Sequence, residues 1–273
     1  MTTITAALVR VAAPECKQPE AAAAALQAAC VAAAFPLTRQ AVAGLLAQLG
    51  HESGLNPLEE NLNYSAAGIA RTWDTRFASA AAAAHLAYNP EALANAVYSG
   101  RMGNTRPGDG WRYRGRGYIQ ITGRDMYRRT GRALGLDLEG NPELALTHSA
   151  SAGAALSYLR ERGLFDELAR GDVLAVTRGI NGGTNGLADR QARYDRLLAA
   201  LPLQAPAPRV FLTTASGSRV LWDGRPTVYG SVGINAAWLT ETQRRWPAPG
   251  EYLTGTTLRL TVAADGALIL ARA

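Results

Sequence analysis

The sequence predicts a mainly α-helical domain over residues 1–203, a Pro-rich linker over residues 204–208 and a small β-rich domain over residues 209–273. Apolar residues recur at helical spacing up to about residue 200. The segment 201–208 contains three prolines, which is typical of a short, semi-rigid linker. After it, runs rich in β-branched and aromatic residues alternate with turn residues, which favours strands. A chain of 273 residues is long enough for one large and one small domain.

Each expected helix has a local signal. The segment 19–34 begins with Pro19, which suits the first turn of a helix. The next helix follows Thr38, a good N-cap, and carries apolar residues at i, i+3 and i+4 spacing over residues 41–49. Further helices are expected over residues 91–98, 124–134, 141–161 and 186–201, separated by Gly-rich loops over residues 100–110 and 179–186.

The last 65 residues contain short runs that are typical of strands. Two Asp-Gly pairs, Asp223-Gly224 and Asp265-Gly266, are typical of hairpin turns between strands. The expected strands cover residues 210–213, 219–222, 226–229, 257–262 and 268–270.

Composition restricts the partners and the compartment. The net charge is +6 and comes almost entirely from arginine, since Lys17 is the only lysine. A basic protein suits an anionic polymer, which includes nucleic acid and the bacterial cell wall. Two cysteines, Cys16 and Cys30, form no disulfide framework, so we expect synthesis in a reducing compartment and leave a single bridge open. Residues 1–5 lack the features of a signal peptide, and no apolar run reaches the ~18 residues of a membrane span.

Two glutamates are the candidate catalytic residues. Glu52 follows Ala41 by about three helical turns and shares its apolar face. Partial burial and the C-terminal end of the helix both disfavour a charged carboxylate, so we expect Glu52 to hold a proton as a general acid does. Glu60 lies beside the polar segment 61–65, which favours the ionised form that a general base needs. Acid–base cleavage of a sugar polymer requires such a pair.

Other chemistries lack their residues. A zinc metalloprotease motif beginning at His51 requires a second histidine at position 55, which is Leu55. Gly115-Arg116-Gly117 lacks the third glycine of a dinucleotide-binding loop, and no serine nucleophile elbow is present. These three kinds of site are therefore not expected.

Several motifs in the same order resemble glycoside hydrolase family 19, which includes plant-type chitinases, and especially its bacteriophage endolysin branch. The resemblance covers about residues 5–200. The matching residues are Gln48–Ser53, Glu60–Ala66, Trp73, Arg76–Phe77, Asn95–Tyr98, Arg101–Asn104, Asp109–Arg124, Ile180–Gly183 and Ala188–Arg190.

The resemblance implies a lysozyme-like, bilobal α-helical catalytic domain and an inverting mechanism that needs no metal and no cofactor. Glu52 matches the general acid, Glu60 the general base, and Thr122 the hydroxyl that holds the attacking water with the base. Inversion requires the two carboxyl groups to lie roughly 6.5–9.5 Å apart. The spacing from Glu52 to Glu60 is one residue shorter than in many endolysins, which leaves Glu59 as a competing base.

Four further residues match positions that line the substrate cleft, and each has an alternative role. Gln120 and Asn181 could instead cap loops with their amide groups. Tyr113 could pack beneath a Gly-rich loop rather than on a sugar ring. Arg190 could orient either Glu52 or Glu60 through an ion pair. Met126 stands where the family often has Asn, so one contact with the sugar is expected to be missing.

From these features we expect a monomeric endolysin that cleaves β-1,4 bonds between the amino sugars of peptidoglycan. Without a signal peptide it would be made in the cytoplasm and reach the wall through a holin-type lesion or a secretion apparatus. We expect no nucleic-acid partner and no stable membrane insertion.

Other activities stay open. One is a chitinase that acts on an N-acetylglucosamine polymer. A second is a lytic transglycosylase that needs Glu52 alone, and a third is an inactive carbohydrate-binding protein. Residues 209–273 hold seven arginines and four acidic residues, a net charge of +3, and suit either a wall anchor or a structural appendage.

Overall fold

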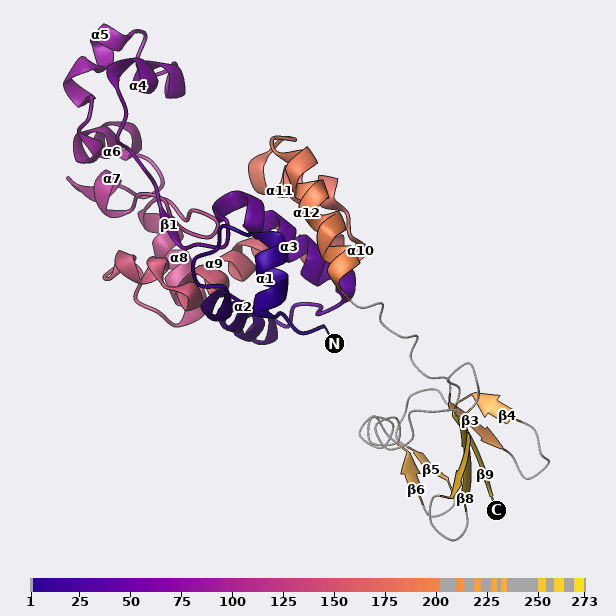
Figure 1. Cartoon of the computed structure of the whole chain (residues 1–273). Coiled ribbons are helices and arrows are strands. Elements are labelled where there is room, and N and C mark those ends of the chain that lie inside the picture. Colours follow the sequence, from indigo (N-terminus) through magenta and orange to yellow (C-terminus); the bar gives the residue numbers. More distant parts are fainter. Residues whose placement is uncertain are drawn as a thin grey trace. The chain divides into compact units, whose positions relative to one another are not determined.

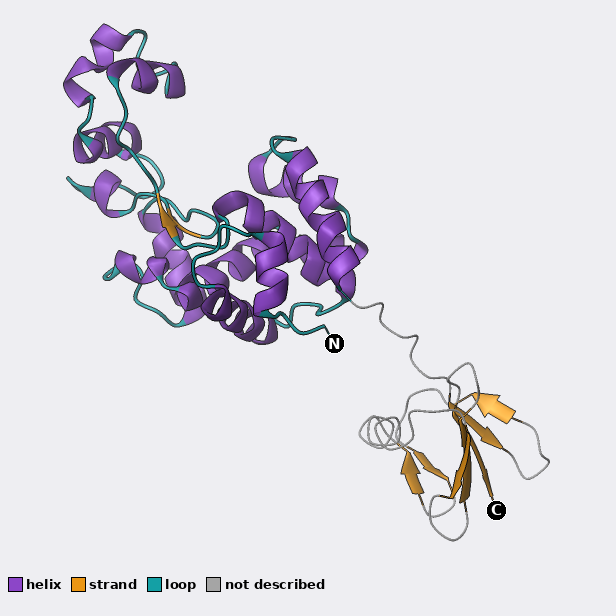
Figure 2. Ribbon diagram, viewed as in Figure 1, coloured by secondary structure: helices purple, strands orange, loops and turns teal. Residues whose placement is uncertain are grey.

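A computed structural model describes residues 2–201 and seven strands of the C-terminal part. The chain divides into two compact units, Met1–Leu203 and Gln204–Ala273. Apart from two short strands, the regular structure of the first unit is helical, and strands are described in the second (Figure 1, Figure 2). The mainly α-helical fold class is therefore confirmed for the first unit. The predicted linker and both predicted Asp-Gly turns lie outside the described residues.

The helices predicted from periodicity are all present in the first unit. The structure adds short helices that the sequence pattern does not predict, because four to nine residues give few periodic positions. It also divides the predicted helix 141–161 into two. The elements are α1 (Ala6–Ala12), α2 (Pro19–Ala32), α3 (Arg39–Ser53), β1 (Leu58–Glu59), α4 (Ala66–Thr72), α5 (Ala80–Ala83), η1 (Ala84–Leu86), α6 (Pro90–Tyr98), α7 (Asp109–Arg112), β2 (Arg116–Gly117), α8 (Arg124–Leu134), η2 (Pro142–Leu146), α9 (His148–Glu161), α10 (Phe165–Arg170), α11 (Val173–Asn181) and α12 (Leu187–Ala200).

The first unit has two lobes, and its buried apolar residues form three clusters, of which the third includes Tyr113 and Tyr127. The larger core surrounds α3, which packs against α1, α10 and α12 and is buried continuously over residues 41–50. A smaller core lies within residues 62–97 and joins α4, α5 and α6. Figure 1 shows these three helices extending away from the helices around α3. Two segments cross between the lobes, and their strands β1 and β2 pair antiparallel.

The ends of α3 are set by local chemistry. The Thr38 hydroxyl accepts a hydrogen bond from the Ala41 amide at 3.2 Å, as its N-cap position predicts. Gly54 ends the helix in the left-handed conformation with φ 58°, and Leu55 follows with φ 53° and a buried side chain. This turn connects α3, which carries Glu52, to β1, which directly precedes Glu60.

An ion-pair network joins α7 and α8 to the loop before η2. Arg124 contacts the Asp109 carboxylate through two nitrogens and donates to Glu139 at 2.9 Å. Arg128 also donates to Glu139, at 3.0 Å. The hydrogen bonds from Arg128 and Arg124 lower the pKa of Glu139 from its ordinary value of 4.5 to about 2.

This network predicts an acid-dependent loss of stability. The lowered pKa of Glu139 means that its contribution to folding is complete above pH 4.5 and disappears as the pH falls toward 2. A Glu139→Gln variant should lose less free energy of unfolding over that interval than the parent protein, by about 1 kcal/mol after solvent screening. Chemical denaturation at a series of pH values measures the difference. Glu143→Gln, whose parent side chain is 73% exposed, is the control, and an identical pH dependence in all three proteins would contradict the prediction.

The second unit contains a five-stranded sheet and a separate hairpin. The sheet order is β4-β3-β9-β8-β7, with β3 and β9 parallel and the other neighbours antiparallel, and the hairpin pairs β5 with β6. The five predicted strands are confirmed within their described residues, whereas β6 and β7 were not predicted. The strands are β3 (Val210–Thr213), β4 (Arg219–Leu221), β5 (Thr227–Tyr229), β6 (Val232–Ile234), β7 (Gly250–Leu253), β8 (Leu258–Val262) and β9 (Leu268–Arg272).

Cys16 and Cys30 are both free thiols, so the single disulfide bridge that the sequence left open is not formed. Burial raises the pKa of the Cys30 thiol to about 12. Among the described residues, no helix combines the length and the apolar character needed to cross a bilayer.

Candidate active site

Glu52 lies in the last turn of α3 and is held by an arginine from α12. Its Oε1 accepts a hydrogen bond from Arg190 Nη2 at 2.6 Å, and its side chain is 24% exposed. Arg190 itself is only 2% exposed and donates a second hydrogen bond to Gln48 Oε1 at 2.5 Å. Gln48 then donates to Thr177 Oγ1 at 3.2 Å. This chain of contacts connects Glu52 and Gln48 of α3 with α11 and α12.

The sequence left either Glu52 or Glu60 open as the ion-pair partner of Arg190. In the structure the partner is Glu52. This contact orients the Glu52 carboxyl group, and the general-acid role of Glu52 stays a prediction.

Glu60 follows β1 at the crossing between the lobes and has neutral partners. Its amide donates to the Gly115 carbonyl at 2.8 Å, and the Gly115 amide donates to Glu60 Oε2 at 3.2 Å. The Tyr98 hydroxyl, from the end of α6, donates to Glu60 Oε1 at 2.6 Å. Both carboxylate oxygens are thus oriented, one by the backbone of the β2 segment and one by the smaller lobe.

Gly115 brings Glu60, Thr122 and Gln120 to one place. A Cβ atom added at Gly115 would lie 2.7 Å from Gln120 Oε1, 3.3 Å from Thr122 Oγ1 and 3.4 Å from Glu60 Cβ. The absence of a side chain therefore lets the candidate base and the candidate hydroxyl pack against the same backbone segment. The Thr122 hydroxyl donates to the Gln120 carbonyl at 3.1 Å, which orients its oxygen.

Glu59, the competing base, is held differently from Glu60. Its Oε1 accepts from Arg114 Nη2 at 2.6 Å and from Arg116 Nε at 2.7 Å. Burial acts to raise the pKa of Glu59, but the hydrogen bonds from Arg114 and Arg116 outweigh it and lower the pKa below its ordinary value. Glu59 is thus committed to two guanidinium groups, whereas the partners of Glu60 described above are neutral, and the base role of Glu60 stays a prediction.

The remaining predicted binding residues make contacts within the protein. Gln120 donates to the carbonyl groups of Leu58 and Gly117, both at 3.0 Å, and ties β1 to β2. Asn181 organises the turn after α11, where it donates to the Asn185 carbonyl at 3.0 Å. These are the capping roles that the sequence left open, and a substrate contact for either amide stays a prediction.

Tyr113 and Met126 pack against one apolar cluster of the first unit. Tyr113 is 1% exposed, and its hydroxyl donates to the Glu139 carbonyl at 3.0 Å. Met126 packs against the same core cluster as Tyr113. Tyr113 therefore occupies a core position, and its predicted binding role is untested. In the described residues, no group of three His, Cys, Asp or Glu side chains is placed to hold a metal ion.

Tyr98 contacts the candidate base Glu60, although no role for it was predicted from the sequence. It belongs to the matched segment 95–98, but nothing local indicates that its hydroxyl reaches a residue 38 positions earlier. Burial raises the pKa of Tyr98, and the hydrogen bond to Glu60 raises it further. The phenol therefore keeps its proton and acts as a donor.

A Tyr98→Phe variant should therefore impair catalysis through Glu60. Loss of one hydrogen bond to a charged group is expected to lower kcat about tenfold and to leave KM nearly unchanged, because Tyr98 orients Glu60 without contacting the sugar. Steady-state kinetics on a soluble oligosaccharide measures both constants. Tyr88→Phe, at a side chain 70% exposed, is the matched control. A rise in KM at constant kcat would show that Tyr98 binds the sugar instead.

The chain is similar to two proteins in sequence and to a solved structure in fold. No protein-family model matches the chain. A glycosyl hydrolase family 19 domain-containing protein of Haemophilus influenzae is 40% identical over 156 residues, which cover 56% of this chain and 76% of that protein. Chitinase 8 of Oryza sativa subsp. japonica is 60% identical over 35 residues, 13% of each chain. The crystal structure of a bacterial family 19 chitinase superposes with a TM-score of 0.51 at 21% identity, over 74% of this chain and 96% of that one. The last likeness confirms the predicted lysozyme-like helical fold.

Proposed function

The chain belongs to glycosyl hydrolase family 19 and is a chitinase-like glycosidase, and from this membership we propose that it cleaves β-1,4 bonds between the amino sugars of bacterial peptidoglycan. The observation that carries the proposal is the different environment of the two glutamates. Glu52 contacts a buried guanidinium, whereas Glu60 contacts a phenol and a backbone amide beside Thr122. Two carboxyl groups with a threonine hydroxyl beside one of them are the groups that the proposed acid–base mechanism uses.

In the proposed reaction the two groups act on opposite faces of the sugar. Glu52 donates a proton to the glycosidic oxygen as the bond to the anomeric carbon breaks. Glu60 accepts a proton from a water molecule, whose oxygen forms the new bond to that carbon, and Thr122 orients the water. Since the water attacks from the face opposite the leaving group, the configuration inverts. Arg190 and Tyr98 act as positioning residues for Glu52 and Glu60.

The net charge of +6 favours peptidoglycan over chitin as substrate. Peptidoglycan carries carboxylates on its peptides, and a basic protein accumulates on an anionic polymer. Chitin is uncharged and gains nothing from this field. The second candidate substrate is nevertheless chitin, because the rice relative is named a chitinase and the superposed structure is a family 19 chitinase.

Product analysis tests the proposal. Purified sacculi and chitin oligomers are incubated with the protein, and the soluble products are examined by mass spectrometry and NMR. We expect disaccharide-peptides with reducing ends from sacculi, released first as the α-anomer. Anhydro-sugar products would identify a lytic transglycosylase. Cleavage of chitin alone would assign a chitinase, and no product from either polymer would fit a binding protein.

We also propose that residues 204–273 anchor the enzyme to the wall. The support is the net charge of +3 in residues 209–273 and their separation into a compact unit of their own. The test compares co-sedimentation of the full chain with sacculi against that of a chain ending at residue 203. Equal sedimentation of the two would contradict anchoring.

A further inference from the structure

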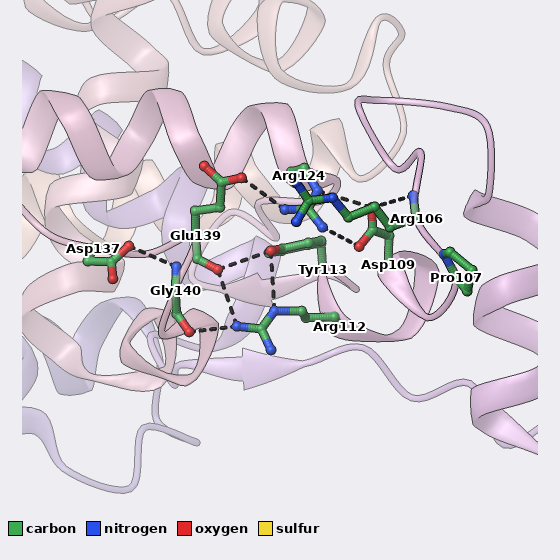
Figure 3. Close-up of a pocket in the computed structure, with 9 residues that line it drawn as sticks. All are labelled: Arg106, Pro107, Asp109, Arg112, Tyr113, Arg124, Asp137, Glu139 and Gly140. Atoms are coloured by element: carbon green, nitrogen blue, oxygen red, sulfur yellow. Dashed lines mark hydrogen bonds and ion pairs between the residues drawn. The ribbon is translucent and has the colours of Figure 1, made fainter.

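A polar cavity of about 540 Å³ lies in the first unit between α7, the start of α8 and the loop before η2 (Figure 3). Neither candidate catalytic glutamate lines it, and the proposed hydrolysis does not use it. Its charged lining residues are Arg106, Asp109, Arg112, Arg124, Asp137 and Glu139.

Half of these charges are already neutralised within the cavity wall. Arg124 pairs with both Asp109 and Glu139, and Glu139 also pairs with Arg128 outside the cavity. In the described part of the chain, no side chain of opposite charge pairs with Arg106, Arg112 or Asp137. The cavity therefore offers positive and negative groups whose charges are free to meet a ligand.

Arg112 and Asp137 both contact the backbone of Gly140, and each also has a second neutral partner, which for Asp137 is the Asn141 amide group, donating to Oδ2 at 3.2 Å. Arg112 Nη2 donates to the Gly140 carbonyl at 2.6 Å, and Arg112 Nε donates to the Tyr113 hydroxyl at 3.2 Å. The Gly140 amide donates to Asp137 Oδ1 at 2.8 Å. Figure 3 shows the two side chains reaching Gly140 from different sides. Because one group contacts the amide and the other the carbonyl of the same residue, the bonded atoms of Arg112 and Asp137 lie at most about 9 Å apart.

A ligand that matches this arrangement carries a carboxylate and an ammonium group close together. A guanidinium binds a carboxylate with charge-assisted, directional hydrogen bonds, and a carboxylate such as that of Asp137 accepts from an ammonium. Asp137 would repel a ligand that carries only negative charge, and Arg106 and Arg112 would repel a ligand that carries only positive charge. The lining therefore favours a zwitterion over a simple anion or a simple cation.

We propose that this cavity binds the zwitterionic end of a peptidoglycan stem peptide, a diamino-dicarboxylic residue such as diaminopimelate. The inference rests on the proposed function, since only peptidoglycan presents such a residue beside the sugars. Arg112 and Arg106 bind the carboxylate and Asp137 binds the ammonium. The cavity thereby distinguishes peptidoglycan that contains diaminopimelate from peptidoglycan that contains lysine, and from chitin.

The cavity is within reach of the sugar that would be cleaved. Three residues along the chain lead from Arg112 to Gly115, whose amide contacts Glu60. An extended chain spans at most about 3.5 Å per residue, so these two positions lie within about 11 Å of each other. A stem of three amino acids covers a similar distance, so it can join a sugar near Glu60 to the cavity.

Kinetics on three soluble, uncross-linked glycans tests the proposal. The glycans carry tripeptides ending in diaminopimelate, tripeptides ending in lysine, or no peptide. The wild-type protein is expected to show a kcat/KM about tenfold higher for the diaminopimelate glycan than for the lysine glycan, the value of one charged hydrogen bond. In Arg112→Gln this ratio should fall to about one. In Asp137→Asn, the ratio of kcat/KM for either peptide-bearing glycan to that for the bare glycan should be lower than in the wild type. Arg129→Gln removes the same charge from the exposed side of α8 and should keep the wild-type ratios.

A binding measurement separates this inference from the proposed function. The free diaminopimelate and lysine tripeptides are titrated into the wild-type protein by calorimetry, with Arg112→Gln and Arg129→Gln in parallel. Tighter binding of the diaminopimelate tripeptide, lost only in Arg112→Gln, supports the cavity even if no glycan is cleaved. A wild-type protein that cleaves all three glycans equally, or binds both tripeptides equally or not at all, would overturn it.

Discussion

A Glu52→Gln variant is expected to cleave the substrate about 10²- to 10⁴-fold more slowly than the wild type, because an amide cannot supply the proton that the leaving oxygen needs. Its fold should persist, since Gln has the shape of Glu and its carbonyl oxygen can still accept from Arg190. Arg190 is buried and would lose its counter-ion, so a modest fall in the free energy of unfolding is expected.

The measurement is the initial rate of bond cleavage on sacculi and on a soluble oligosaccharide, with circular dichroism and a thermal melt of the same sample. Glu161→Gln, which removes the same charge from the exposed end of α9, is the control and should keep the wild-type rate. Equal cleavage by wild type and a folded Glu52→Gln protein would refute the role of Glu52.

Glu60→Gln should cause a loss of similar size, because water activation then lacks its base. Its neighbour provides a comparison at almost the same place in the chain. Glu59→Gln should keep most of the activity but destabilise the fold by about 1–3 kcal/mol, because Arg116 is 1% exposed and would lose a charged partner. The pair of variants separates a catalytic carboxylate from a structural one.

Rates and denaturation curves for the two variants are measured side by side. The reverse pattern, with an inactive Glu59→Gln and an active Glu60→Gln, would transfer the base role to Glu59. An active Glu60→Gln that still needs Glu52, together with anhydro-sugar products, would instead establish the transglycosylase alternative.

Local sequence signals located the main helices because they depend on neighbouring residues. Thr38 and Gly54 mark the ends of α3 through capping and a left-handed backbone, and the apolar spacing between them follows the helical period. The short helices α4, α5 and α7 were missed because their stability comes from contacts with other helices rather than from their own pattern.

The sequence by itself determined the helical character of the first unit, the order of its motifs and the two candidate glutamates. Only the tertiary structure decided which groups touch those glutamates. Arg190 lies 138 residues from Glu52, and Tyr98 lies 38 residues from Glu60, so their hydrogen bonds exist only after α12 and α6 have packed into place. Helix periods and caps are set by residues a few positions apart, whereas the partners of a charged side chain depend on how distant segments meet.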